Sequence, residues 1–140
     1  MDIEPPPTTP VQTDQQAAGR RVLCIEDERF ITELYIRALT KAGYLVDAVA
    51  DGKEALAAAE TNQYDIILLD LMIPSITGID ILRTLRDPAR VPPIKAKIIV
   101  TTNLEQREDV RADIEKQADG YVVKAELTPH ELVNFLDRIK

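Results

Sequence analysis

A buried strand that ends in a carboxylate is the most constraining feature of this sequence. Residues 66–69 read Ile-Ile-Leu-Leu, an uninterrupted apolar run typical of a parallel strand covered on both faces. The run stops at Asp70, and Pro74 and Gly78 mark a turn before a helical pattern over residues 79–86. In open α/β sheets ligands bind at the carboxyl ends of the strands, which is where Asp70 stands. Taken alone, Asp70 also fits an Asx turn or a helix cap.

Four further apolar segments alternate with amphipathic helical patterns along the chain. Asp47 interrupts the second segment and favours an edge position for it, while Asp51 and Thr128 are expected helix caps. Five such units predict an α/β fold, a doubly wound, flavodoxin-like parallel sheet of five strands in the order 2-1-3-4-5, with helices on both faces. The expected strands are residues 22–25, 44–49, 66–69, 97–100 and 121–123, and the expected helices are residues 31–42, 51–61, 79–86, 104–117 and 129–139.

Composition divides the chain into a tail and a single domain. Residues 1–19 are rich in proline and polar side chains, which predicts a disordered tail, and residues 20–140 form the expected domain. The net charge of -7 disfavours nucleic acid or an anionic membrane surface as a partner. No segment approaches the length of a membrane span, and the acidic start is unlike a signal peptide, so we expect a cytoplasmic protein. The single cysteine, Cys24, is expected to be buried in the first strand.

The carboxyl ends of the expected strands carry a set of polar side chains. Glu26 and Asp27 follow the first strand, Asp70 the third, Thr101 the fourth and Lys124 the fifth. Three carboxylates at one rim repel one another, and a divalent cation such as Mg²⁺, which prefers oxygen ligands, relieves that repulsion. The set lacks a Ser-His or Cys-His pair, and it suits phosphoryl transfer onto a carboxylate with Mg²⁺ and a lysine neutralising the transferred group.

Four segments together resemble the receiver domains of two-component response regulators, the family of the bacterial chemotaxis regulator. By this resemblance, Asp70 accepts a phosphoryl group from a phosphohistidine on a sensor histidine kinase or a histidine phosphotransfer protein. The segments, which occur in the family's order and spacing, are residues 22–28, residues 68–74 with Gly78, residues 98–102 and residues 120–124.

The resemblance also implies a metal site. Asp27, Asp70 and the backbone carbonyl of Met72 would ligate Mg²⁺, for which Mn²⁺ could substitute, and Glu26 would act through water. The acidic pair is Glu-Asp where the family usually has Asp-Asp. The metal geometry should tolerate this difference because only the second acid must touch the ion.

A signalling switch is implied as well. Lys124 and Thr101 would bind the phosphoryl oxygens, and Thr101 and Tyr121 would form a switch that reshapes the surface of the fourth helix, fifth strand and fifth helix. The output partner is left open, and so is the choice between a monomer and a weak phosphorylation-dependent dimer. Ala125 stands where the family usually has a proline joined by a cis bond. We expect a trans bond at Lys124–Ala125, because a non-proline cis bond costs about 2.5–4 kcal/mol.

Two other classes of protein remain as alternatives. A pseudo-receiver would keep the fold as an interaction module without being phosphorylated. An aspartyl-phosphate phosphatase of the haloacid dehalogenase type needs a second Asp where Met72 stands, so we expect no enzyme beyond self-catalysed phosphotransfer and slow autodephosphorylation. Met72 and Asn103 occupy the positions that in the family flank the water attacking the acyl phosphate. The chain is expected to be either a stand-alone receiver or part of a longer protein.

Overall fold

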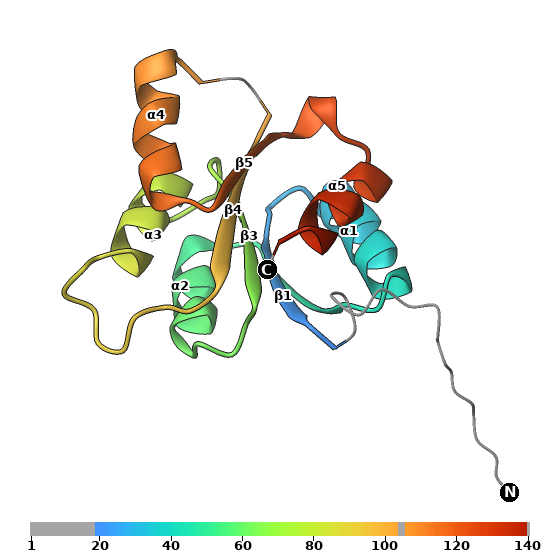
Figure 1. The fold of residues 1–140 in the computed structure, drawn as a ribbon, viewed down its shortest axis with the longest axis horizontal. Coiled ribbons are helices and arrows are strands. Elements are labelled where there is room, and N and C mark those ends of the chain that lie inside the picture. Colours follow the sequence, from blue (N-terminus) through green and yellow to red (C-terminus); the bar gives the residue numbers. More distant parts are fainter. Residues whose placement is uncertain (1–18, 104–105, 140) are drawn as a thin grey trace, which may run out of the picture.

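The computed structural model describes residues 19–103 and 106–139, in which strands and helices alternate along the chain (Figure 1). Of the predicted tail, all but Gly19 lies outside the described residues. The strands are β1 (Arg21–Ile25), β2 (Leu45–Val49), β3 (Ile66–Asp70), β4 (Lys97–Thr102) and β5 (Gly120–Val123). The helices are α1 (Arg29–Lys41), α2 (Gly52–Glu60), α3 (Gly78–Leu85), α4 (Glu108–Gln117) and α5 (Pro129–Asp137), with a short 3₁₀ helix, η1 (Lys124–Glu126), after β5.

The strands form one parallel sheet in the predicted order β2-β1-β3-β4-β5. Every residue of β3 is buried, as expected for a central strand, whereas β2 is half-buried or exposed throughout and lies at the edge, as Asp47 predicts. The register pairs Asp70 at the end of β3 with Thr101 on β4. Because all strands run the same way, their carboxyl ends meet at one rim of the sheet.

Helices cover both faces of the sheet (Figure 1). Alternate residues of each strand point to opposite faces, so each strand contributes to two separate apolar clusters. One cluster packs between the sheet and α2, α3 and α4, and the other packs between the sheet and α1 and α5. Among the described residues, every helix falls short of the length and apolar character that a membrane crossing demands.

The helix caps follow the predicted chemistry. The side chain of Asp51 accepts hydrogen bonds from the first turn of α2, and Thr128 and Glu131 form a reciprocal capping box at α5. The predicted start of the fourth helix is wrong at residues 106 and 107, because Arg107 is the N-cap, with a non-helical backbone, and α4 begins only at Glu108. Residues 104 and 105, also predicted as helix, lie outside the described residues.

Arg86 connects several segments at the amino ends of β4 and β5, away from the carboxyl rim. The guanidinium of Arg86, which follows α3, donates to the backbone carbonyls of Ile94, Ala96 and Gln117 at 3.0, 2.8 and 3.2 Å. It also forms a 2.7 Å ion pair with Asp119. These bonds fix the loop before β4 and the last residue of α4 to the end of α3.

Candidate functional site

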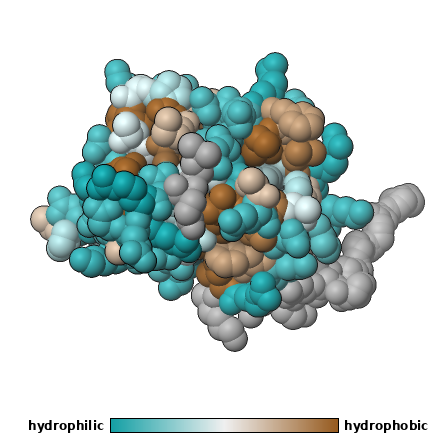
Figure 2. Space-filling model, turned by 90° about the horizontal axis from the view of Figure 1, so that it is seen from above, coloured by the Kyte–Doolittle hydropathy of each residue, from teal (hydrophilic) through white to brown (hydrophobic). Residues whose placement is uncertain are grey.

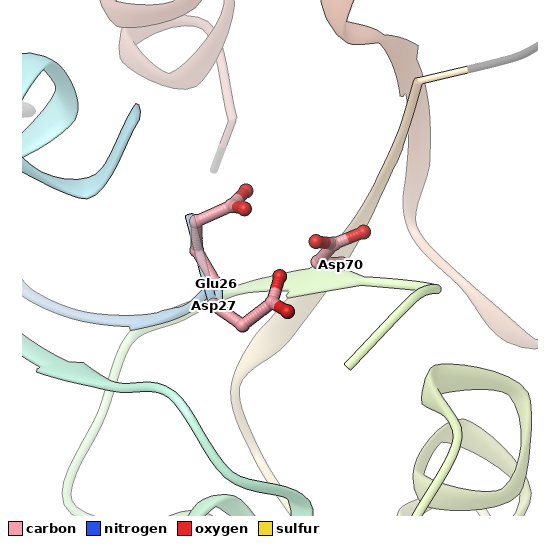
Figure 3. Close-up of side chains that lie close together, drawn as sticks. All are labelled: Glu26, Asp27 and Asp70. Carbon is pink, nitrogen blue, oxygen red and sulfur yellow. The ribbon is translucent and has the colours of Figure 1, made fainter. Parts of the chain in front are cut away.

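Three carboxylates meet at the carboxyl rim of the sheet (Figure 3). Glu26 and Asp27 follow β1, Asp70 ends β3, and one oxygen from each lies within 4.8 Å of the others. Asp70 and Glu26 are only 1% and 3% exposed, whereas Asp27 is open to solvent. The cluster therefore combines a buried floor with an accessible side.

A buried lysine bridges two of these carboxylates. The Nζ atom of Lys124 lies 2.5 Å from Oε1 of Glu26 and 3.1 Å from Oδ2 of Asp70. The remaining oxygens are held by the backbone: the N–H of Glu28 donates to Oε2 of Glu26 at 3.1 Å, and the N–H of Met72 donates to Oδ1 of Asp70 at 3.0 Å. Both buried acids are therefore fixed in orientation by two donors each.

Burial and neighbouring charges shift the pKa values of Glu26 and Lys124. Burial raises the pKa of Glu26 above its ordinary value, and the hydrogen bond from Lys124 offsets only part of that rise. Burial by itself lowers the pKa of Lys124, but the hydrogen bond to Glu26 and the charge of Asp70 outweigh it, so the pKa is raised. Lys124 is therefore a cation at neutral pH.

The chain leaves Lys124 through a trans peptide bond and a short 3₁₀ helix. The Lys124–Ala125 bond is trans, as predicted, since Val91–Pro92 is the only cis bond in the described part of the chain. The chain turns directly after β5 into η1, whose first residue is Lys124. The sequence analysis did not anticipate this short helix.

Gly78 sets the shape of the loop that follows Asp70. A Cβ atom at this position would lie 2.4 Å from the backbone oxygen of Asp70 and 2.6 Å from the Cα of Leu71. The N–H of Gly78 also donates to the carbonyl of Leu71 at 3.1 Å. Only glycine allows the start of α3 to approach the end of β3 so closely.

Thr101 and Tyr121 lie on opposite faces of the sheet. Thr101 is paired in register with Asp70 and is 2% exposed, so both side chains point to the same face. Tyr121 is paired with Val100 and packs against the apolar cluster below α2, α3 and α4. The two predicted switch residues are therefore neighbours across β4 and β5 without sharing a face.

Gln106, just before α4, and Arg111, within α4, both contact Tyr121. The backbone N–H of Gln106 donates to the Tyr121 hydroxyl at 3.2 Å, and the guanidinium of Arg111 lies 4.4 Å from the centre of the ring. The amide of Gln106 also donates to the buried hydroxyl of Thr102 at 3.4 Å. The sequence analysis missed Gln106, and a backbone donor in a polar loop leaves no signal in a sequence.

The structure thus gathers Glu26, Asp27, Asp70 and Lys124, with Thr101 beside them and Tyr121 one strand away. Three carboxylates against one ammonium leave two formal negative charges in a small volume. Hard oxygen ligands with that excess charge fit a divalent cation such as Mg²⁺. The side chain of Met72 is 70% exposed, and it is the backbone of this residue that approaches the cluster, through its N–H.

Comparison with known proteins agrees with this geometry. The family model of the response regulator receiver domain matches residues 22–137. The chain belongs to the response regulator receiver domain family. The matched region contains the whole acidic cluster, Lys124, Thr101 and Tyr121, and the receiver domain is a module of signalling proteins of two-component systems.

Named relatives of the receiver domain are response regulators. The chain is 37% identical over 109 residues to the transcriptional regulatory protein TcrA of Mycobacterium tuberculosis, and this match covers 78% of this chain and 42% of TcrA. It is 35% identical over 120 residues to the response regulator ArlR of Staphylococcus aureus, and this match covers 86% of this chain and 51% of ArlR. The chain therefore spans about half the length of the curated relatives it matches.

Solved structures show the same fold. The chemotaxis protein CheY4 of Vibrio cholerae superimposes with a TM-score of 0.73 at 29% identity, covering 88% of this chain and 100% of that one. The receiver domain of the sensor histidine kinase PA1611 of Pseudomonas aeruginosa also superimposes with a TM-score of 0.73, at 30% identity, and the match covers 86% of this chain and 97% of that one. That receiver domain has a magnesium ion coordinated in its active site cleft.

Proposed function

We propose that this receiver domain accepts a phosphoryl group on Asp70 from a phosphohistidine of a sensor histidine kinase or a histidine phosphotransfer protein, in a reaction that depends on Mg²⁺. The observation that carries the proposal is the position of Asp70: a buried carboxylate 3.1 Å from Lys124, beside two further acids whose oxygens lie within 4.8 Å. The family match and the magnesium in the PA1611 receiver domain support it.

The chain's own residues supply most of the chemistry. An oxygen of Asp70 attacks phosphorus, the bond from phosphorus to the imidazole nitrogen breaks, and its electron pair stays on that nitrogen. The ammonium of Lys124 neutralises charge on the transferred oxygens, and Thr101 offers them a hydroxyl donor.

Metal binding completes the site in this proposal. Asp27 and Asp70, which lie in the acidic cluster, would hold Mg²⁺ or Mn²⁺ together with the backbone carbonyl of Met72, and Glu26 would act through a water molecule. The bound cation supplies positive charge next to the phosphoryl oxygens. Glu26 has a second task, because its 2.5 Å contact holds Lys124 in the site.

Two large apolar side chains on this rim suit contact with the phosphodonor protein. Phe30 in the first turn of α1 and Met72 after β3 are each 70% exposed. Figure 2 looks down on this face and shows hydrophobic residues intermingled with hydrophilic ones. A mixed surface of this kind fits a transient partner.

Phosphorylation becomes a signal through β4 in this proposal. The phosphoryl group attracts the hydroxyl of Thr101, and the end of β4 follows. Because Gln106 follows β4 and donates to the Tyr121 hydroxyl, this shift loosens Tyr121 and alters the surface of α4, β5 and α5. The free protein samples both arrangements, and an output partner stabilises one through its differential affinity.

The test is mass spectrometry of the intact protein after incubation with acetyl phosphate and Mg²⁺. We expect one phosphoryl adduct on the wild type, none on Asp70→Asn, and a normal adduct on Asp80→Asn, which removes an exposed carboxylate of α3. An unmodified wild type identifies a pseudo-receiver. Continuous turnover of acetyl phosphate without an adduct identifies an enzyme, and either result overturns the proposal.

A further inference from the structure

A second polar hollow lies at the amino ends of the strands, the end of the sheet opposite to Asp70. Its volume is about 300 Å³. Arg20 precedes β1, Tyr64 and Asp65 precede β3, and Lys95 and Lys97 lie at the start of β4. Residues from three adjacent strands of the sheet therefore line one hollow.

Positive charge dominates this hollow. Arg20, Lys95 and Lys97 face a single carboxylate, that of Asp65, which already accepts the backbone N–H of Arg21 at 2.8 Å. Neither lysine ammonium has a hydrogen-bond or ion-pair partner among residues 19–103 and 106–139. In a chain with a net charge of -7, this local excess of cations is out of keeping with the rest of the surface.

Hydrogen bonds fix the chain segments that carry these cations. Asn62, which has a positive φ of 58°, accepts the N–H of Lys95 at 2.9 Å and donates to the carbonyl of Pro93 at 3.0 Å. The guanidinium of Arg20 donates to the carbonyl of Ile139 at 2.9 Å through one nitrogen. The lysines are anchored at their backbones, Lys97 through its N–H to the carbonyl of Asp65 at 2.9 Å. Within residues 19–103 and 106–139, Arg20 makes no further side-chain hydrogen bond, which leaves other N–H donors for a ligand.

We propose that this hollow binds a small phosphoryl-type oxyanion, such as a pyrophosphate or a phosphate monoester. A tetrahedral phosphoryl group presents several oxygens and can meet the three cations that precede or begin β1 and β4, whereas one planar carboxylate presents two oxygens. The volume of about 300 Å³ matches the lower range of small-molecule sites. The site is separate from Asp70 and is independent of the function proposed for that residue.

The test is a titration of the full chain with inorganic pyrophosphate, followed by ¹H–¹⁵N NMR in metal-free buffer of low ionic strength. We expect saturable shifts at the amides of Asn62, Gln63 and Lys95, with a dissociation constant at or below about 1 mM. The Asp70→Asn variant should bind equally well, because it changes the opposite end of the sheet. Absence of saturable shifts, or shifts confined to the rim at Asp70, overturns the proposal.

Two matched double variants test the role of the cations. Lys95→Gln with Lys97→Gln should weaken pyrophosphate binding by about tenfold or more. Lys53→Gln with Arg107→Gln removes the same charge from exposed positions beside the carboxyl rim and should leave binding nearly unchanged. Equal weakening by both pairs points to a general charge effect and contradicts the proposal, as does tighter binding of citrate than of pyrophosphate.

Discussion

The ammonium of Lys124 lies 2.5 Å from Oε1 of Glu26, closer than the 3.1 Å that separates it from Asp70. In the metal-free protein, the charge of Lys124 is therefore shared between two buried acids. Burial and the nearby charge of Asp70 disfavour the ionised carboxylate of Glu26, whereas the contact with Lys124 favours it. The pKa of Glu26 is raised, so the effects that disfavour the ionised form are the larger ones.

The first prediction concerns the variant Glu26→Gln. Removing one partner of a buried ion pair commonly costs about 3–5 kcal/mol, because a charge is left unpaired. Here Lys124 keeps Asp70, and the repulsion between the two acids disappears. We therefore expect the unfolding free energy of the metal-free domain to stay within about 1 kcal/mol of the wild type or to rise. Urea denaturation measures this difference, and a loss of several kcal/mol would refute the argument.

Metal binding should stabilise the folded domain. A cation that binds only the folded state raises its stability by mass action, so Mg²⁺ should raise the thermal midpoint of the wild type by several degrees at saturation. Asp27→Asn should lose most of that rise, because Asp27 is the exposed acid of the cluster. The neighbouring change Glu28→Gln serves as the control and should keep it. Circular dichroism melts with and without Mg²⁺ provide the comparison.

Gly78→Ala should distort the phosphoacceptor position. Its added Cβ would lie 2.4 Å from the backbone oxygen of Asp70, and backbone atoms cannot yield as a side chain can. We expect a loss of about 2–3 kcal/mol in stability and slower labelling by acetyl phosphate. Gly120→Ala is the matched control, because its Cβ would meet the side-chain ends of Ile99 and Phe135. Similar losses in both variants would show that the approach to Asp70 is not special.

The aspartyl phosphate should be long-lived. Met72, at the position that flanks the attacking water in the family, has an exposed apolar side chain that cannot orient water. Met72→Asn should therefore speed the decay of the phosphorylated protein, whereas Met72→Leu should leave it slow. Decay is followed by intact-protein mass spectrometry after removal of acetyl phosphate. Unchanged or slower decay in Met72→Asn would count against this role.

Cys24 should be unreactive in the folded protein. Burial raises the pKa of its thiol to about 12, so the reactive thiolate is scarce at pH 8. A thiol pKa raised by folding contributes stability that is fully present below the unfolded value of about 8.5 and is lost as the pH rises towards 12. We expect slow reaction with a thiol reagent at pH 8, rapid reaction in urea, and a lower urea midpoint at pH 10 than at pH 8. Equal rates with and without urea would contradict this.

The strands of the sheet could be predicted from the sequence because each is marked by its own short pattern of apolar and charged residues. The apolar run before Asp70 identifies a strand buried on both faces, and Asp47 identifies the edge, since a charge is tolerated where one side of a strand is open. The convergence of Glu26, Asp27, Asp70 and Lys124 follows from parallel strands alone. None of this requires knowledge of side-chain packing.

The features that sequence analysis missed depend on tertiary contacts. Leu39 of α1 is completely buried because α1 packs against α5 as well as the sheet, and the helical pattern alone does not reveal that second contact. Ile94 and Ala96 are buried in a loop that its prolines mark as irregular. The contact from Gln106 to Tyr121 uses a backbone donor, which every residue except proline possesses.

The hydrogen bond from Arg86 fixes one end of α4 and leaves the other end able to tilt. The last residue of α4, Gln117, is held by the guanidinium of Arg86, while the first turn of α4 follows Gln106, which contacts Tyr121. Ten helical residues span about 15 Å, so a tilt of roughly 10° about the held end carries the first turn through roughly 2–3 Å. A displacement at the end of β4 would thus move α4 most at Glu108 and Asp109 and least at Gln117, so a partner bound over the first turn would sense it.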